Sequence, residues 1–182
     1  MLYKLKEQPF CLTTLPGQSV EMAMVDHLAS QGCHAIYHDY FLFHESKRTR
    51  HPESEQVLKR TIGEERLSHL RQITAQLYPF GVGAGVAPEQ PDLFVYNNSG
   101  DHFFCEVKQK RTGDRLRPPQ MLGISLIATF LACPVILAIV SDSNDHQMET
   151  REYHWIWPCV QECGFLERNL TTEIPEEAQP ET

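Results

Sequence analysis

Two carboxylates and a lysine that flank one polar turn are the residues best suited to chemistry in this chain. Asp92 opens one apolar run, and Glu106 and Lys108 lie in a second run beyond the turn. Side chains alternate along a strand, so Glu106 and Lys108 point the same way, and a turn centred near Ser99 sets position 92 opposite position 106. Adjacent carboxylates repel each other, and a divalent cation relieves that repulsion. The spacing therefore predicts a metal-dependent phosphodiesterase centre.

The alternative for these residues is a surface acid pair with Lys108 as its salt-bridge partner, which is a common arrangement in hairpins. The setting of Glu106 argues against it. Glu106 interrupts the run Phe-Phe-Cys-Glu-Val, which otherwise has the composition of a core strand. A buried carboxylate needs a partner or a metal, because burying it alone is costly.

A further carboxylate, Glu21, lies on a predicted helix over residues 20–31. Ser19 can cap that helix, and Gly32 suits its end. Glu21 begins a stripe at helical spacing whose other members are apolar, namely Met24, Val25 and Leu28. Glu21 is therefore either an inward-facing ligand or a first-turn residue favoured by the helix dipole, and helix geometry alone supports both interpretations equally.

The remaining elements follow from periodicity and turn composition. Residues 1–18 are expected to be an irregular lead-in, and 45–78 to contain helices, with Pro52 starting one and Gly63 separating two. A helix is expected from Pro119 to Leu131, apolar nearly all round, with Gln120 facing out of its first turn. Strands are expected at 34–44, 93–96, 103–108, 135–140 and 153–157.

The composition is that of an ordinary globular protein of 182 residues, with a net charge of −8. Residues 1–171 are predicted to form one domain, with 44–78 as a helical elaboration and 172–182 as an acidic, disordered tail. The negative charge at first argues against a nucleic-acid partner. Between Lys108 and Arg117, however, five basic side chains accompany one aspartate. A basic loop beside clustered acids suits a metal site that meets a polyanion, although a solvated loop has the same composition.

Cysteine and histidine usage predicts no disulfide framework and no zinc site. Six cysteines without a secretory leader indicate a reduced, cytoplasmic protein. Four of them are expected to be small core residues: Cys11, Cys33, Cys105 and Cys133. Three histidines near the second predicted strand lack ligand spacing and are expected to be surface or core residues: His34, His38 and His44.

Residues 121–140 carry no charge and are long enough to cross a bilayer. Pro134 lies inside this stretch, and proline disrupts the interior of a helix. The stretch is therefore predicted to divide into a helix, a break at Pro134 and a buried strand. No membrane contact is expected, and a membrane span is kept as the alternative, since apolar length alone does not separate the two cases.

The order of these elements resembles that of the PD-(D/E)XK nucleases: helix with Glu, strand, Pro-Asp, strand, Glu-x-Lys, helix, strand. More narrowly, PDLFVY…FFCEVK…DRLRPPQ resembles the virus-type replication-repair nuclease (VRR-NUC) domain, which also ends the Fanconi-anaemia-associated nuclease. The likeness covers Pro91–Val140 closely and the first helix loosely. Asp114, Leu116 and Gln120 lie at the distances that the motif has. The chain departs from the family in its longer basic loop, 109–113, and in the segment 44–78.

The resemblance implies an α/β fold of the restriction-endonuclease type, a mixed β-sheet flanked by helices with an α-β-β-β-α-β core. It implies Mg²⁺ or Mn²⁺ held by oxygen ligands from Glu21, Asp92, Glu106 and the Val107 carbonyl. It also implies that Lys108 positions the attacking water or stabilises developing charge, and that Gln120 orients water or phosphate. Backbone phosphates of DNA would be bound by four basic residues: Lys110, Arg111, Arg115 and Arg117.

The activity implied by the resemblance is structure-selective cleavage of branched DNA, of the Holliday-junction or flap type. Two alternatives remain open. One is a nucleic-acid-binding module that has lost the chemistry, and the other is a restriction-type endonuclease that reads a DNA sequence, with 44–78 as its recognition segment. The apolar helix from Pro119 is a candidate homodimer surface.

Overall fold

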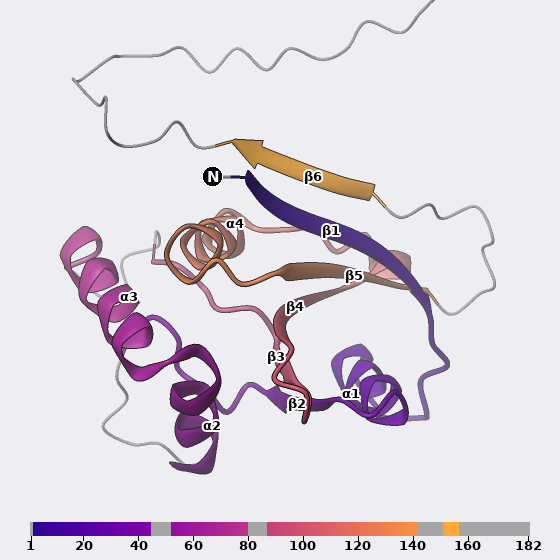
Figure 1. Ribbon diagram of the computed structural model, residues 1–182. Coiled ribbons are helices and arrows are strands. Elements are labelled where there is room, and N and C mark those ends of the chain that lie inside the picture. Colours follow the sequence, from indigo (N-terminus) through magenta and orange to yellow (C-terminus); the bar gives the residue numbers. More distant parts are fainter. Residues whose placement is uncertain (1, 45–51, 80–86, 142–150, 157–182) are drawn as a thin grey trace, which may run out of the picture.

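The computed structural model describes residues 2–44, 52–79, 87–141 and 151–156, and in them six strands form one mixed sheet (Figure 1). The order across the sheet is β2-β3-β4-β5-β1-β6. In that order the strands are β2 (His34–Tyr37), β3 (Leu93–Tyr96), β4 (His102–Gln109), β5 (Val135–Ser141), β1 (Leu2–Cys11) and β6 (Arg151–Ile156).

Strand direction changes three times across the sheet. β2, β3 and β4 are antiparallel neighbours, β4, β5 and β1 run parallel, and β6 runs antiparallel to β1 at the far edge. The β3–β4 hairpin is closed by Asn97, whose side-chain oxygen accepts from the backbone N–H of Ser99 and of Asp101, both at 3.0 Å. Gly100 has a φ of +90°, a left-handed conformation that glycine adopts without steric cost.

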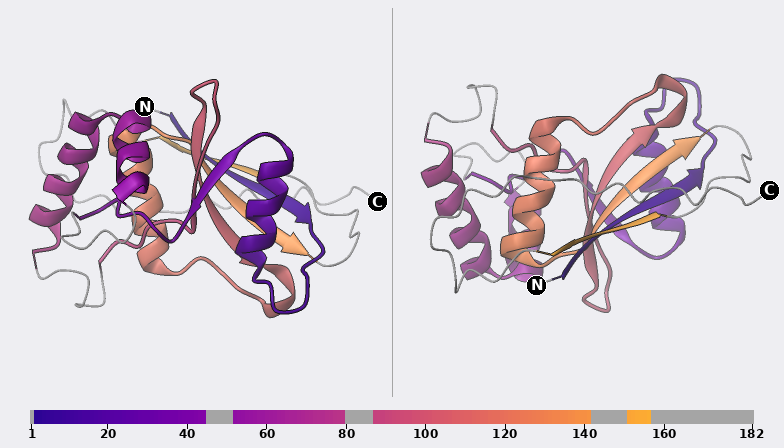
Figure 2. Two further views of the ribbon diagram at one scale, coloured as in Figure 1. Left: turned by 90° about the horizontal axis from the view of Figure 1, so that it is seen from below. Right: turned by 90° about the horizontal axis from the view of Figure 1, so that it is seen from above.

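Helices cover both faces of the sheet (Figure 2). On one face, α1 (Val20–Ser30) buries Met24 and Leu28 against β3, β4 and β5. On the other face lie α2 (Pro52–Ile62), α3 (Glu64–Leu77) and α4 (Pro118–Leu126), which continues as a π-helical turn (Ile127–Leu131). The chain order α1-β2-β3-β4-α4-β5 confirms the predicted α/β fold, a mixed sheet flanked by helices with a restriction-endonuclease-like core.

The N-terminal stretch is where the sequence prediction is wrong, because residues 2–11 form strand β1 and not an irregular lead-in. The charged residues Lys4, Lys6 and Glu7 interrupt the apolar pattern by which a strand is recognised in a sequence. Backbone pairing on both sides defines it, seven residues in register with β5 and six with β6. Both partner strands lie in the second half of the chain, so the residues near β1 in sequence do not predict this pairing.

The strand predicted over 34–44 is shorter than expected and ends at Tyr37. At His38 the backbone takes a φ of +58°, which an L-residue with a side chain rarely adopts, and the chain leaves the sheet. The aromatic and apolar residues that suggested a longer strand are buried in the core outside the sheet: Tyr40, Leu42 and Phe43.

The uncharged stretch 121–140 divides as predicted, into α4 with its π-helical turn and the buried strand β5. No helix among the residues that the structure describes is long and apolar enough to span a membrane. The apolar composition of α4 reflects burial within the chain itself. A Cβ at Gly123 would lie 1.9 Å from the carbonyl oxygen of Glu89, so only glycine permits this close approach.

Several smaller predictions also have outcomes. Ser19 caps α1 by accepting from the Met22 N–H at 3.3 Å, and Gly63 separates α2 from α3. Cys105 and Cys133 are buried, Cys33 is half-buried, and Cys11 is exposed and not a core residue. Trp157, where the strand expected over 153–157 ends, and the tail 172–182 lie outside the described residues.

Candidate active site

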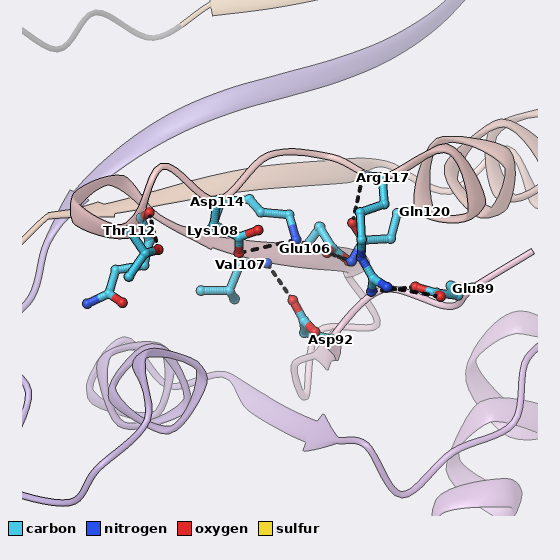
Figure 3. A network of polar contacts seen from close by, with 10 residues as sticks. Glu89, Asp92, Glu106, Val107, Lys108, Thr112, Asp114, Arg117 and Gln120 are labelled. Atoms are coloured by element: carbon cyan, nitrogen blue, oxygen red, sulfur yellow. Dashed lines mark hydrogen bonds and ion pairs between the residues drawn. The ribbon is translucent and has the colours of Figure 1, made fainter.

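Strand β4 brings the first two candidate residues together, as its alternation predicts. Glu106 and Lys108 lie on one face of β4, and the Lys108 Nζ is 2.8 Å from the Glu106 Oε1 (Figure 3). Asp92 immediately precedes β3, whose first pair, Leu93 with Cys105, sets Asp92 beside Glu106. The Asp92 Oδ2 accepts from the Val107 N–H at 2.8 Å.

The two carboxylate oxygens of Glu106 have different surroundings. Oε1 accepts from the Lys108 ammonium at 2.8 Å and from the Gln120 Nε2 at 2.5 Å. Oε2 is buried and has no hydrogen-bond partner. Burial, followed by the charge of Asp92, raises the pKa of Glu106 to about 7. Negative charge at this position is thus only partly compensated by the protein.

The pKa of Asp92 is raised as well. Burial raises its pKa, and the charge of Glu21 raises it further, although the Val107 N–H and Lys108 oppose both effects. Glu21 is half-buried in the first turn of α1 and lies close enough to Asp92 to act on it electrostatically. Glu21 from α1 and Glu106 from β4 are therefore each near enough to Asp92 for their charges to interact with it.

Lys108 is a buried cation, with 5% of its side chain exposed. Burial lowers the pKa of the ammonium, but the hydrogen bond and ion pair with Glu106 outweigh burial, and the net pKa is raised. A second carboxylate, Asp114, lies 3.5 Å from the Nζ. Lys108 is consequently held in the charged form, between Glu106 and the loop that follows β4.

Gln120 does not face outward, as the helix start had suggested, but is buried with 5% exposure. Its Oε1 accepts from the Arg117 N–H at 3.0 Å, which satisfies a donor at the start of α4. Its Nε2 donates to Glu106. The amide therefore links the α4 N-terminus to the acid pair, and outward placement was wrong because two buried polar partners need it.

The predicted DNA-binding residues lie on the surface, in the segment that joins β4 to α4. Lys110 and Arg111 lie in a single 3₁₀ turn (Lys110–Thr112) directly after β4, and both are exposed, as is Arg115. Arg117 is exposed but forms a two-point ion pair with Glu89, at 2.6 and 3.3 Å. Arg115 lines a pocket together with Lys108, and Arg117 links the segment to the chain before β3.

Sequence reasoning missed the residues that hold Asp92 in place. The Tyr40 hydroxyl donates to the Pro91 carbonyl at 2.5 Å. The side chain of Gln90 donates to the Tyr40 carbonyl at 2.5 Å and accepts from the Leu42 N–H at 3.1 Å. The segment after β2 thereby clamps the two residues before Asp92. A buried tyrosine in an aromatic run was the only signal in the sequence, and it was consistent with a plain strand.

The donor set suits a hard divalent cation. Within the described ranges, no three His, Cys, Asp or Glu side chains lie in a group that could hold a metal ion by themselves. The residues nevertheless fit such an ion, because the unpartnered Oε2 of Glu106 and the raised pKa of Asp92 both mark negative charge that lacks compensation. Oxygen ligands of this kind are those that Mg²⁺ and Mn²⁺ prefer.

No family model matches the chain, and no curated protein does. Among solved structures, the chain is similar to crystal structures of paFAN1 bound to 5′-flap DNA with a gap, with a flap of one or two nucleotides. The identities are 17% and 15%, and the TM-scores are 0.46 and 0.44, over 75% of this chain. The chain spans 38% and 37% of those chains, and the likeness is one of backbone arrangement.

Proposed function

We propose that this protein is a Mg²⁺- or Mn²⁺-dependent, structure-selective DNA endonuclease of the VRR-NUC type that cuts branched DNA. The observation that carries the proposal is the convergence of Asp92 and Glu106 across the β3–β4 pair, with a buried, unpartnered oxygen on Glu106 and a charged lysine at its other oxygen. A surface salt bridge would not leave a carboxylate oxygen buried and unpaired.

The metal would be held by carboxylate oxygens of Glu21, Asp92 and Glu106 and by the Val107 carbonyl. When bound, such an ion lowers the pKa of the attacking water and neutralises charge on the leaving oxygen. The carboxylates supply the negative charge that retains the ion. Their incomplete compensation by the protein is the physical reason why binding would be favourable.

Lys108 and Gln120 take supporting roles in this proposal. The Lys108 ammonium, charged and buried beside Glu106, would stabilise negative charge that develops on the scissile phosphate. Gln120 would keep Glu106 oriented through its hydrogen bond to Oε1. The exposed cations Lys110, Arg111 and Arg115 would contact backbone phosphates and position the strand without reading bases.

A cleavage assay over DNA shapes tests the proposal. Wild-type protein would be incubated with end-labelled Holliday junctions, 5′ flaps, 3′ flaps and plain duplex of the same sequence, in Mg²⁺, in Mn²⁺ and in EDTA. Metal-dependent cuts near the branch point, with little cutting of the duplex, are expected. Cutting in EDTA would contradict the metal role, equal cutting of all shapes would contradict structure selection, and no cutting of any shape would favour a binding module.

A further inference from the structure

A pocket of about 360 Å³ lies beside the acid cluster, on the face of the sheet that α4 covers. Its walls are mostly aliphatic and come from β1, β5 and α4, through Leu5, Leu137, Ile139 and Met121. Four charged residues also line it, namely the cations Lys108 and Arg115 and the carboxylates Glu7 and Asp114. The proposed chemistry uses none of the aliphatic walls, and packing of the core does not require them to leave an open space.

The pocket is continuous with the proposed active site through one side chain. The Lys108 ammonium, which contacts Glu106 at 2.8 Å, also lines the pocket. A group held in the pocket would therefore be next to a phosphate that lies at the acid pair. Met121 at the rim is 52% exposed, so the pocket is open to solvent and not sealed in the core.

The chemistry of the walls defines what the pocket accepts. Aliphatic walls favour a group with apolar faces, and the cations Lys108 and Arg115 favour a negative charge attached to it. Carboxylates also line the pocket, at Glu7 and Asp114, and suit hydrogen-bond donors on the edge of such a group. A nucleobase with its own phosphate has all three properties.

We infer that this pocket receives an unpaired nucleotide adjacent to the scissile phosphate. A base inside a continuous duplex is paired and stacked, so it must be pulled out before it can enter, at a cost that an unpaired base does not have. The pocket would thereby favour flaps, gaps and single-stranded ends over duplex DNA. This inference rests on the proposed function and names the feature of the substrate that the site selects.

The test fills the pocket and follows one base. Ile139→Trp places a large side chain in it, and Ile136→Trp makes the same change on the opposite face of β5. A 5′-flap DNA carries a single 2-aminopurine, which brightens when it is unstacked, moved by one nucleotide at a time across the branch. Binding is measured in Ca²⁺, and cleavage is measured separately in Mn²⁺.

Brightening at one position with wild-type protein and Ile136→Trp, and its loss with Ile139→Trp, is expected. Cleavage of the flap by Ile139→Trp should fall about tenfold or more, because a nucleotide that cannot enter the pocket leaves the scissile phosphate less well positioned. No brightening at any position with wild type, or brightening that persists in Ile139→Trp, would overturn the inference. Absence of wild-type cleavage would instead count against the proposed function, whatever the fluorescence shows.

Two further arms complete the design. If thermal melting shows that Ile139→Trp does not fold, Met121→Trp at the exposed rim closes the pocket without entering the core, and the same losses are expected. Titration with dAMP alone tests a free nucleotide as the ligand. Micromolar binding of dAMP with no brightening on any DNA would assign the pocket to a mononucleotide and would also overturn the inference.

Discussion

Glu106 has one oxygen with two donors and another buried with none. If Glu106 served only to stabilise the fold, both of its oxygens would be expected to have donors, or the position would carry a neutral side chain. An unpaired buried polar atom lowers stability by about 1–3 kcal/mol. Glu106 therefore lowers the free energy of unfolding of the protein. Such sites are candidates for function, and the raised pKa points to the same cost.

The first prediction concerns how the buried carboxylate of Glu106 makes the free energy of unfolding depend on pH. The pKa of Glu106 is about 7 in the folded protein, against 4.5 for an ordinary glutamate. Between these values the folded state binds more protons than the unfolded state, so stability falls as pH rises through this window. In EDTA, Glu106→Gln should stabilise the protein at pH 8 by about 1–3 kcal/mol and have little effect at pH 5.

Urea denaturation at the two pH values measures this difference in the free energy of unfolding. Glu53→Gln, at an exposed position of α2, is the matched control and should change stability little at either pH. If Glu106→Gln destabilises the protein at pH 8, the ion pair with Lys108 outweighs the burial of charge, and the assigned direction of the pKa shift is wrong.

The second prediction concerns Gln120. Gln120→Met keeps the volume of the side chain and removes both hydrogen bonds of its amide, one to Glu106 and one from Arg117. Glu106 then keeps Lys108 as its one donor and the Arg117 N–H loses its acceptor, so unfolding free energy should fall by about 1–3 kcal/mol. Denaturation in urea measures it, with Gln76→Met on the exposed face of α3 as control. Equal stability of the two variants would argue against a positioning role for the amide.

At the scale of elements, Asp92 owes its position to a segment that is not part of its hairpin. The chain after β2 reaches across to residues 90 and 91 through Tyr40 and Gln90, and β3 then starts directly after Asp92. Tyr40 is 1% exposed, and its hydroxyl is the donor to the Pro91 carbonyl. The position of Asp92 therefore depends on how the chain leaves β2.

The third prediction follows from this clamp. Tyr40→Phe should lower the free energy of unfolding by about 1 kcal/mol, since one buried hydrogen bond is lost. Cleavage should fall by more than DNA binding does, because Asp92 loses its support while the basic surface is unchanged. Tyr96→Phe, half-buried on β3, is the control. A parallel loss of binding and cleavage would indicate general unfolding and not a loss of positioning.

The elements predicted well are those whose signals are local. The β3–β4 hairpin, the cap and end of α1, and the break before β5 are each fixed by turn residues or caps within a few positions. The placement of Asp92 opposite Glu106 followed from the hairpin register alone. For this reason, the centre of the candidate site was predictable without the fold.

The features that were missed depend on distant partners. Strand β1 is defined by pairing with β5 and β6, which follow it by more than a hundred residues. After β2 ends, the Tyr40 carbonyl and the Leu42 N–H pair with the side chain of Gln90, which is distant in sequence. Gln120 is buried where its amide donates to Glu106. Each is a tertiary effect that a local pattern does not contain.

At the scale of the whole molecule, the net charge of −8 opposes the proposed binding of DNA, and a small basic surface would have to offset it. In the proposed function that surface is formed by Lys110, Arg111 and Arg115, which are exposed in the segment after β4. Long-range repulsion is screened by salt, whereas contacts between cations and phosphates release counterions and weaken as salt rises. Binding should therefore be governed by the local surface at physiological ionic strength.

The fourth prediction measures this local surface. Arg115→Ala should weaken DNA binding to all sequences alike and reduce the slope of log affinity against log salt by about 0.7–0.9, the effect of one lost phosphate contact. Fluorescence anisotropy over a series of KCl concentrations provides the slope. Arg60→Ala, exposed near the end of α2, is the control. If the two variants give the same slope, Arg115 does not contact phosphate.

The most direct test of the central claim is the cleavage rate of Asp92→Asn with flap DNA in Mn²⁺, compared with wild type and with Asp101→Asn. Asparagine keeps the shape of Asp92 but removes the charge that a metal requires, while Asp101 lies exposed at the turn of the same hairpin. Wild type and Asp101→Asn should cut at similar rates, and Asp92→Asn should be slower by at least about a hundredfold, as for loss of a key electrostatic group. Equal rates for all three would contradict a metal-dependent centre at Asp92 and Glu106.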